Sequence, residues 1–171
     1  MTASRNGFTL VELLIVVGVI GVVSAIALPN LVRARAASNE ASASGSLRTI
    51  NSGQQTFRFT CGAGMYSPSL QNLGANIMGQ PGFVPTDLAT PPPVRKSGYQ
   101  YDLGTTSASA TISCNGGPTG GTYHVTADPL AVAGMRHFGS NSGGGIYQSQ
   151  NTLVGVMPDV GPPPAPATPL Q

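Results

Sequence analysis

The stretch GFTLVELLIVVGVIGVVSAIALPN, residues 7–30, decides the fold of this chain. Residues 13–32 carry no charged side chain, and spanning the hydrocarbon of a membrane takes roughly 20 mostly apolar residues. The run is therefore long enough to be a membrane helix. One carboxylate, Glu12, stands at its start, where an ionised group is expensive. Any account of the segment has to explain Glu12.

Two ordinary interpretations leave Glu12 unexplained. A secretory signal has a basic start, an apolar stretch of about 7–15 residues and a cleavage site with small residues. Arg5, the run 13–23 and the sequence Ala25-Ile26-Ala27 fit that pattern, and they predict a soluble secreted binding protein released after Ala27. A plain signal anchor is the second interpretation. Basic residues flank both ends of the run, so the charge bias leaves its orientation open.

A third interpretation uses Glu12. The string GFTLVE (residues 7–12), followed by a charge-free run and then Pro29, closely resembles the N-terminus of type IV prepilins and type II secretion pseudopilins, the class III prepilins. The resemblance covers residues 7–35 without a gap. It implies that a prepilin peptidase cuts between Gly7 and Phe8 on the cytoplasmic side. Phe8 then becomes the N-methylated first residue, and the apolar segment stays on the mature protein.

The resemblance also implies a role for Glu12 in subunit assembly. A lone ionised side chain at mid-membrane costs about 2.5–3.5 kcal/mol on insertion scales. An incoming subunit would offset that cost by offering its Phe8 ammonium to a resident Glu12. Two alternatives stay open: an ion pair within one chain, since positions four apart share a helix face, and a protonated Glu12. The sequence permits all three, and the resemblance favours the pairing between subunits.

Gly21 and Pro29 place helix-disfavouring residues in the apolar run. In a helix interior, Gly costs about 1 kcal/mol and Pro about 3 kcal/mol relative to Ala. Membrane helices tolerate both, and Gly21 with Ala25 permits close contact between helices. In the filaments of pilins similar to this chain, the segment between such a Gly and such a Pro can lose regular helix. The resemblance therefore implies an irregular helix over 21–29 after assembly.

The helical signal continues beyond the membrane segment. Four apolar residues recur at alternating four- and three-residue spacing, which predicts a narrow stripe on one helix face: Ala43, Leu47, Ile50 and Phe57. We expect one helix from Phe8 to about Arg58. Its membrane and assembly half covers 8–32, and its amphipathic half covers 33–60. The resemblance implies that residues 1–7 form a cytoplasmic leader peptide.

After residue 61 the period of the apolar residues changes to two. Alternation over 99–103, 108–114 and 123–127 predicts half-buried strands, and a weaker fourth strand is indicated at 135–138 or 145–148. We expect an α+β fold, the pilin fold, in which an antiparallel sheet of three or four strands packs on the helix stripe. The extracytoplasmic head then spans 61–160. The proline-rich residues 161–171 are expected to form a flexible tail.

Cys61 and Cys114 both follow the membrane segment. If the head lies outside the cytoplasm, a disulfide between them is chemically allowed. It would tie the helix end to the sheet and contribute about 4 kcal/mol in the chain-entropy model. Two unpaired thiols are the alternative.

The composition favours a structural protein over an enzyme. Charged residues make up 8% of the chain, and 23 glycines and 15 prolines indicate many turns and a modest core. The basic residues are scattered, so we expect no nucleic-acid partner. His124 is expected to face solvent. The four aspartates beyond the membrane segment are too dispersed for a calcium site, and no nucleotide-binding or nucleophile motif is present. We expect no catalysis, no metal and no cofactor.

These observations predict a structural subunit of a type IV pilus-like filament, with a type II secretion pseudopilin as the alternative. The partners that the resemblance implies are further copies in a homopolymer or mixed pilin filament, the prepilin peptidase, and the pilus or secretion assembly machinery of the inner membrane. Before assembly the chain would cross the bacterial inner membrane once, with its N-terminus in the cytoplasm. Afterwards it would lie in a surface pilus or a periplasmic pseudopilus.

Overall fold

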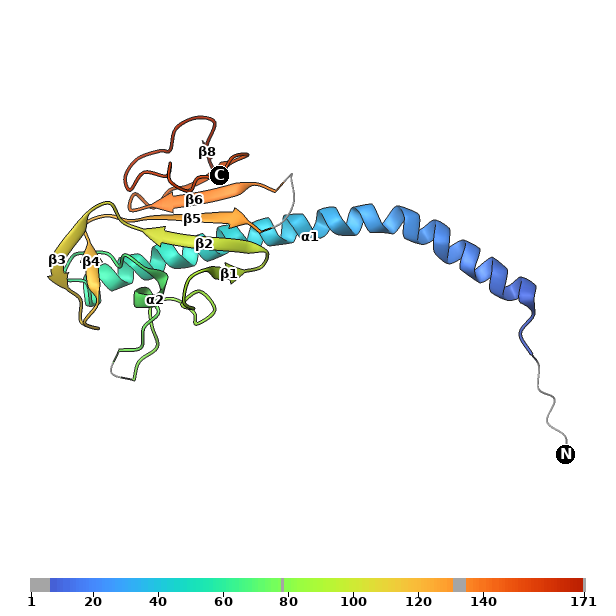
Figure 1. Ribbon diagram of the computed structural model, residues 1–171, viewed down its shortest axis with the longest axis horizontal. Coiled ribbons are helices and arrows are strands. Elements are labelled where there is room, and N and C mark those ends of the chain that lie inside the picture. The colour runs from blue at the N-terminus through green and yellow to red at the C-terminus, as the bar shows by residue number, and fades with distance from the viewer. Residues whose placement is uncertain (1–6, 78, 131–134, 171) are drawn as a thin grey trace. The chain divides into compact units, whose positions relative to one another are not determined.

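The computed structural model describes residues 7–77, 79–130 and 135–170, so all of the expected leader except Gly7 lies outside the described residues (Figure 1). The chain divides into two compact units, Met1–Ser38 and Asn39–Gln171, and we call the second the head unit. One long helix, α1 (Leu10–Thr60), contributes to both. The predicted long helix is confirmed, and it begins and ends within two residues of the expected positions.

Within the head unit, α1 buries the apolar stripe that its sequence predicts. The stripe has no exposed surface at four positions: Ala43, Leu47, Ile50 and Phe57. Full burial of a Leu, Ile or Phe side chain contributes about 1.5–3 kcal/mol. Gln54 is also fully buried, and its amide is satisfied at both ends by Ser67. Its Nε2 donates to the Ser67 carbonyl at 2.7 Å, and its Oε1 accepts from the Ser67 N–H at 2.9 Å.

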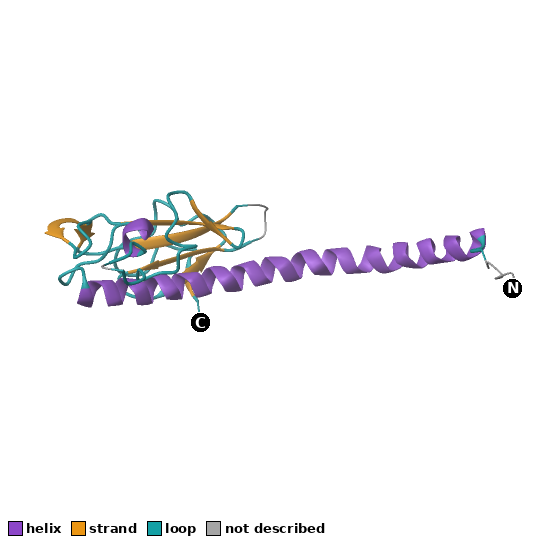
Figure 2. Ribbon diagram, turned by 90° about the horizontal axis from the view of Figure 1, so that it is seen from below, coloured by secondary structure: helices purple, strands orange, loops and turns teal. Residues whose placement is uncertain are grey.

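The head unit contains a six-stranded antiparallel sheet, which Figure 2 shows alongside the part of α1 that belongs to the same unit. The strand order is β1-β2-β5-β6-β7-β8. The bounds are Val94–Lys96 (β1), Tyr99–Gly104 (β2), His124–Pro129 (β5), His137–Asn141 (β6), Ile146–Ser149 (β7) and Thr168–Pro169 (β8). A short helix, α2 (Leu70–Leu73), precedes them. The α+β fold is confirmed, with more strands than the three or four expected.

One predicted strand does not join this sheet. β3 (Ala108–Ile112) pairs with β4 (Pro118–Gly120) in a separate two-stranded sheet, while β2 pairs directly with β5. The apolar positions of β3 are exposed and its Ser109 and Thr111 are half-buried, so the alternation points the opposite way from the prediction. Two alanines and one isoleucine offer little apolar area to bury. The assignment of 108–114 to the main sheet was therefore wrong.

Both of the weaker strand signals, at 135–138 and 145–148, overlap strands of the structure. Residues 137–141 form β6 and 146–149 form β7, where only one strand was expected in this region. β1, at 94–96, lies in a stretch that was expected to be an irregular connection. The sheet therefore gains strands at positions where the sequence alternates weakly.

The face of the sheet turned away from α1 is covered by the C-terminal segment, residues 150–161. Its Leu153 and Met157 are buried. A Cβ at Gly139 of β6 would lie 2.9 Å from the Met157 sulfur and 3.1 Å from a Leu153 methyl carbon. The segment therefore packs directly on the sheet backbone, and the sheet has two covered faces instead of the single one that the sequence predicted.

The last described residues of the proline-rich end pair with the sheet, so the expectation of a flexible tail over 161–171 does not hold at 168–170. β8 pairs with β7 through Tyr147 opposite Pro169 and Gln148 opposite Thr168. The Leu170 N–H donates to the Ile146 carbonyl at 2.8 Å, and the Leu170 side chain packs against the core. Without these contacts β7 would be an open sheet edge with unpaired backbone groups.

Cys61 and Cys114 form a disulfide. It joins the residue after α1 to the residues that follow β3, and the Cys114 N–H also donates to the Cys61 carbonyl at 2.9 Å. The bond therefore ties the helix end to the small β3–β4 sheet. The expectation that it would reach the main sheet was wrong, because 105–123 leaves that sheet as an excursion between β2 and β5.

α1 offers a matched pair of glycines that tests the packing of the helix in the head unit. A Cβ at Gly53 would lie 2.6 Å from the Phe83 carbonyl oxygen, whereas one at Gly45 would have no neighbour within 4 Å. We expect Gly53→Ala to lower the free energy of unfolding by about 1–3 kcal/mol, because the Phe83 backbone must move. Gly45→Ala should raise it by about 0.5–1 kcal/mol, because Ala is the better helix former. Denaturant unfolding of the detergent-solubilised chain measures both, and equal shifts would contradict the close approach.

Candidate functional site

The candidate functional site is the N-terminal end of α1, where the residues singled out by the sequence lie together. Gly7 and Phe8 precede the helix in non-helical backbone, and the Phe8 side chain is 82% exposed. A Cβ at Gly7 would meet nothing within 4 Å. The peptide bond between Gly7 and Phe8 is therefore open to an enzyme and is not locked in helical hydrogen bonds.

Thr9 and Glu12 cap this end of the helix. The Glu12 Oε2 accepts from the Thr9 N–H at 2.9 Å and from the Thr9 hydroxyl at 2.7 Å, and the Thr9 hydroxyl oxygen accepts from the Glu12 N–H at 3.2 Å. This reciprocal pattern is a capping box, which satisfies backbone N–H groups that the first helical turn leaves without partners. The carboxylate also lies at the positive end of the helix dipole.

The capping box is a role for Glu12 that the sequence interpretation missed. The signal was present as T-x-x-E immediately before an apolar run, which is the usual sequence pattern of this cap. Both contacts with Thr9 use Oε2. Among the described residues, Oε1 has no hydrogen-bond partner, so the cap leaves one carboxylate oxygen available.

Behind the cap, the apolar side chains of α1 are exposed all round the helix. The large apolar side chains from Leu10 to Val32 are each about half exposed or more. A helix that is apolar on every side needs a membrane or other protein around it. By length and composition α1 can cross a membrane, and no part of its most apolar stretch is buried.

The helix is continuous through Gly21 and Pro29. Neither Gly18 nor Gly21 has a neighbour within 4 Å of a built Cβ. Pro29 removes one backbone donor from the helical ladder, and the Asn30 side chain donates to the Ile26 carbonyl at 3.3 Å on the next turn. The irregularity expected for 21–29 concerns the assembled filament, and it stays a prediction.

Comparison with known proteins addresses the same end of the chain. Residues 2–28 match the family model described as the prokaryotic N-terminal methylation motif. At this end the chain is therefore similar to proteins that carry an N-terminal methylation motif. The type IV major pilin protein PilA of Myxococcus xanthus (strain DK1622) is 43% identical over 53 residues, which is 31% of this chain and 24% of that relative. This chain thus spans about a quarter of the length of that relative, and no solved structure matches it.

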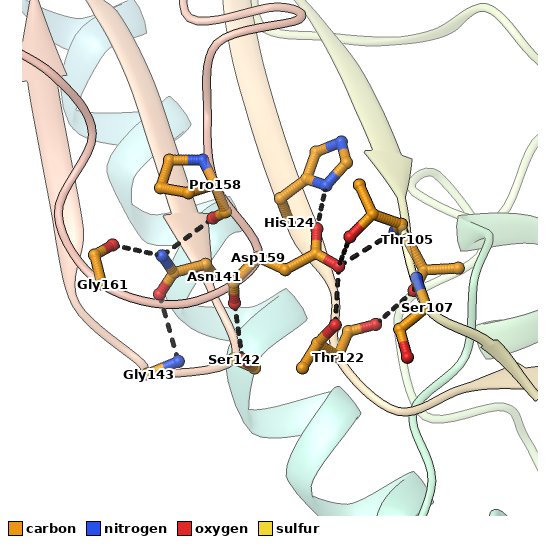
Figure 3. A network of polar contacts seen from close by, with 11 residues as sticks. Thr105, Ser107, Thr122, His124, Asn141, Ser142, Gly143, Pro158, Asp159 and Gly161 are labelled. Atoms are coloured by element: carbon orange, nitrogen blue, oxygen red, sulfur yellow. Dashed lines mark hydrogen bonds and ion pairs between the residues drawn. The ribbon is translucent and has the colours of Figure 1, made fainter.

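The head unit holds a second polar centre, around Asp159 in the C-terminal segment (Figure 3). Its Oδ2 accepts from the Thr106 N–H at 2.9 Å, the Thr106 hydroxyl at 2.7 Å and the Thr122 hydroxyl at 2.6 Å. Its Oδ1 contacts the His124 Nδ1 at 2.5 Å. The expectation that His124 faces solvent was wrong, because the C-terminal segment covers that face of the sheet and places Asp159 against the ring.

The surroundings of Asp159 indicate a structural role. Both carboxylate oxygens are already occupied by donors from the protein. The Asp159 carbonyl accepts from Ser142, and the buried Asn141 amide donates to the Pro158 and Gly161 carbonyls. Within 7–77, 79–130 and 135–170, no group of three or more His, Cys, Asp or Glu side chains could hold a metal ion. The network fastens the C-terminal segment to the sheet.

The pH dependence of stability tests the Asp159 network. Burial by itself would raise the pKa of the Asp159 carboxyl, but hydrogen bonds from the two threonines and His124 outweigh it and hold that pKa well below its usual range. Since the folded-state pKa is lowered, the carboxylate stabilises the fold above its unfolded-state pKa of about 3.9. That contribution is lost as the pH falls below this value.

We expect Asp159→Asn to lower the free energy of unfolding at pH 7 by about 1.5–3 kcal/mol, the range for hydrogen bonds to a charged group. The variant should also lose part of the fall in stability between pH 5 and pH 2 that the parent shows. Asp87→Asn is the control, because Asp87 is half-exposed in a surface pair with Lys96, and such pairs contribute about 0–1 kcal/mol. Unfolding curves at several pH values measure all three proteins. Equal losses in the two variants would contradict the network.

Proposed function

We propose that this chain is a structural subunit of a type IV pilus-like filament, made as a membrane-held precursor and polymerised through its N-terminal helix. The observation that carries the proposal is the Gly7–Phe8 bond placed just ahead of a capped helix whose apolar run is exposed on every side. A helix of this kind is unstable in water and needs lipid first and neighbouring subunits later. The methylation motif supports the same conclusion.

Processing takes place between Gly7 and Phe8 in this proposal. A prepilin peptidase at the cytoplasmic face of the inner membrane removes residues 1–7, and Phe8 is then N-methylated. The exposed, non-helical backbone at Gly7 and Phe8 supports a cut there. A signal peptidase cut after Ala27 would instead fall inside α1 (Leu10–Thr60), where the backbone is helical.

The head unit lies outside the cytoplasm in this topology, because the leader and its peptidase are on the cytoplasmic side. The disulfide between Cys61 and Cys114 supports that placement, since disulfides persist in oxidising compartments. After assembly the head would lie in a surface pilus or, if the filament belongs to a type II secretion system, in a periplasmic pseudopilus. Other partners are the prepilin peptidase and the inner-membrane assembly machinery.

In the assembly step, the Phe8 ammonium of an incoming subunit pairs with Glu12 of a subunit already in the filament. The geometry of Glu12 supports this pairing, because Oε2 takes both contacts with Thr9 and leaves Oε1 for a second partner. The capping box and the pairing between subunits are therefore compatible. Two opposite charges removed from water fix the axial register, since a shifted subunit would leave each of them unpaired.

The mature N-terminus tests the processing step. We expect mass spectrometry of the protein isolated from membranes or filaments to find Phe8 as the first residue, carrying one methyl group. An N-terminus at Leu28 and a protein found free outside the cell would contradict the proposal and support a soluble secreted protein. Imaging cells with and without the gene then separates a surface pilus from a periplasmic pseudopilus.

Variants at Glu12 and Thr9 test the assembly step. Glu12→Ala should leave insertion and cleavage intact but greatly reduce filament number, because removing one member of a buried ion pair costs on the order of 3–5 kcal/mol. Glu12→Gln should be intermediate, since its amide oxygen can still accept from Thr9 but carries no charge. Thr9→Val keeps the charge and loses both hydroxyl contacts of the cap, so it should retain most filaments. Cleaved protein in membrane fractions and filament counts by electron microscopy measure these effects.

Two outcomes would contradict the role of Glu12 in assembly. Normal filament numbers in Glu12→Ala would show that the carboxylate does not set the register. If Thr9→Val instead reduces filaments as strongly as Glu12→Ala, the helix cap and not the charge is what assembly needs.

A further inference from the structure

Four of the five carboxylate side chains of the head unit have a partner within the chain. Glu40 accepts from the Arg136 Nε at 2.9 Å and Nη2 at 2.6 Å, and Asp87 contacts Lys96 at 2.9 Å. The other two paired carboxylates are Asp128, with His137, and Asp159, with His124. Asp102 has neither an ion pair nor a hydrogen bond among the described residues.

Two cations of the head unit likewise have no partner among the described residues. Arg136 and Lys96 are paired as above, and Arg58 donates to the Gly64 carbonyl at 2.9 Å and to the Tyr66 hydroxyl at 3.0 Å. Arg48 and Arg95 are exposed, and within the described part of the chain neither has a hydrogen-bond or ion-pair partner. In a chain with so few charges, these unpaired groups are candidates for contacts with another molecule.

Arg48 differs from Arg95 because it lines a concave site. A groove of about 510 Å³ runs along α1 beside the loop at 82–83. The residues that line it are Arg48, Thr49, Ser52, Gly53, Thr56, Gly82 and Phe83. The Thr49 and Thr56 hydroxyls already donate to helix carbonyls one turn back, at 3.1 and 3.0 Å. The Arg48 guanidinium is therefore the charged hydrogen-bond donor of the groove, and a ligand that binds there should offer an anionic acceptor.

Asp102 lies on the other side of the head unit. Its neighbours in β2, Tyr101 and Leu103, are buried in the core, so the Asp102 side chain points away from α1. The C-terminal segment covers β6 on this face but leaves Asp102 exposed. Arg95, which is opposite Gln100 in the register, lies on the same face and belongs to the same surface as Asp102.

We propose that the Asp102 carboxylate of one subunit enters the groove of a second copy of this chain and pairs with its Arg48. The occupant follows from charge complementarity, because Asp102 is the carboxylate left over in the head unit and Arg48 the cation left over in a concave site. The two surfaces lie on different sides of the head unit, so the contact is heterologous. Contacts of that type, repeated without closure, build open helical filaments. This inference rests on the proposed filament function.

Charge exchange tests the pairing. Asp102→Arg and Arg48→Asp, each made alone in the full-length chain, place like charges against each other at every contact between subunits. We expect each to reduce filament number by about tenfold or more, because like charges placed directly opposite each other repel. The double variant, which restores opposite charges, should recover filaments. Both side chains are exposed and have no hydrogen-bond or ion-pair partner among the described residues, so membrane content, cleavage and unfolding temperature should match the parent.

Control variants separate the possible failures. Arg33 and Arg35 are exposed cations of α1 that follow the apolar run. Asp102→Arg combined with Arg95→Asp, Arg33→Asp or Arg35→Asp should not recover filaments. Recovery by one of these and not by Arg48→Asp overturns the pairing with Arg48. Normal filaments in both single variants overturn the inference and leave the filament function standing. Absence of filaments from the unmodified chain in its own cells overturns the filament function and this inference together.

Discussion

The rest of this chain depends on how the apolar surface of α1 is covered, because the single chain leaves that surface exposed. From Leu10 to Val32, large apolar side chains lie on every side of α1 and remain exposed within the single chain. Water is an unfavourable surrounding for such a surface, since about 25 cal/mol is gained for each Å² of apolar area removed from it. Lipid meets that requirement for one subunit, and a bundle of identical helices meets it for many.

The need to cover this apolar surface also explains the position of Glu12, which lies at the start of the apolar run. An ionised group within an apolar bundle is tolerated when it is paired and hydrogen-bonded. Glu12 begins with two hydrogen bonds from Thr9 through a single oxygen, so part of its polarity is satisfied before any partner arrives. The same contacts close the first helical turn. One side chain thus serves local helix formation and stays available to a second molecule.

The head unit solves a different problem, that of stabilising a small domain with few charges and many glycines. Its sheet is covered on one face by α1 and on the other by the C-terminal segment, and the last strand closes the β7 edge. The carboxylates are used mainly as internal fasteners: Asp159 holds the segment to the sheet, and Glu40 holds α1 to Arg136. The few charges left unpaired at the surface are consequently informative about contacts between molecules.

What the sequence by itself determined is what depends on neighbours along the chain. Helical periodicity predicts the length of α1, its apolar run and the buried stripe from Ala43 to Phe57. The T-x-x-E pattern also predicts the cap, although the sequence analysis did not use it. Only the tertiary structure decided which strands pair, that β3 leaves the sheet, that the tail becomes a strand and that His124 meets Asp159. Those features depend on contacts between residues far apart in sequence. A two-residue period shows that a strand has two different faces, but which of them is covered is decided by another part of the chain.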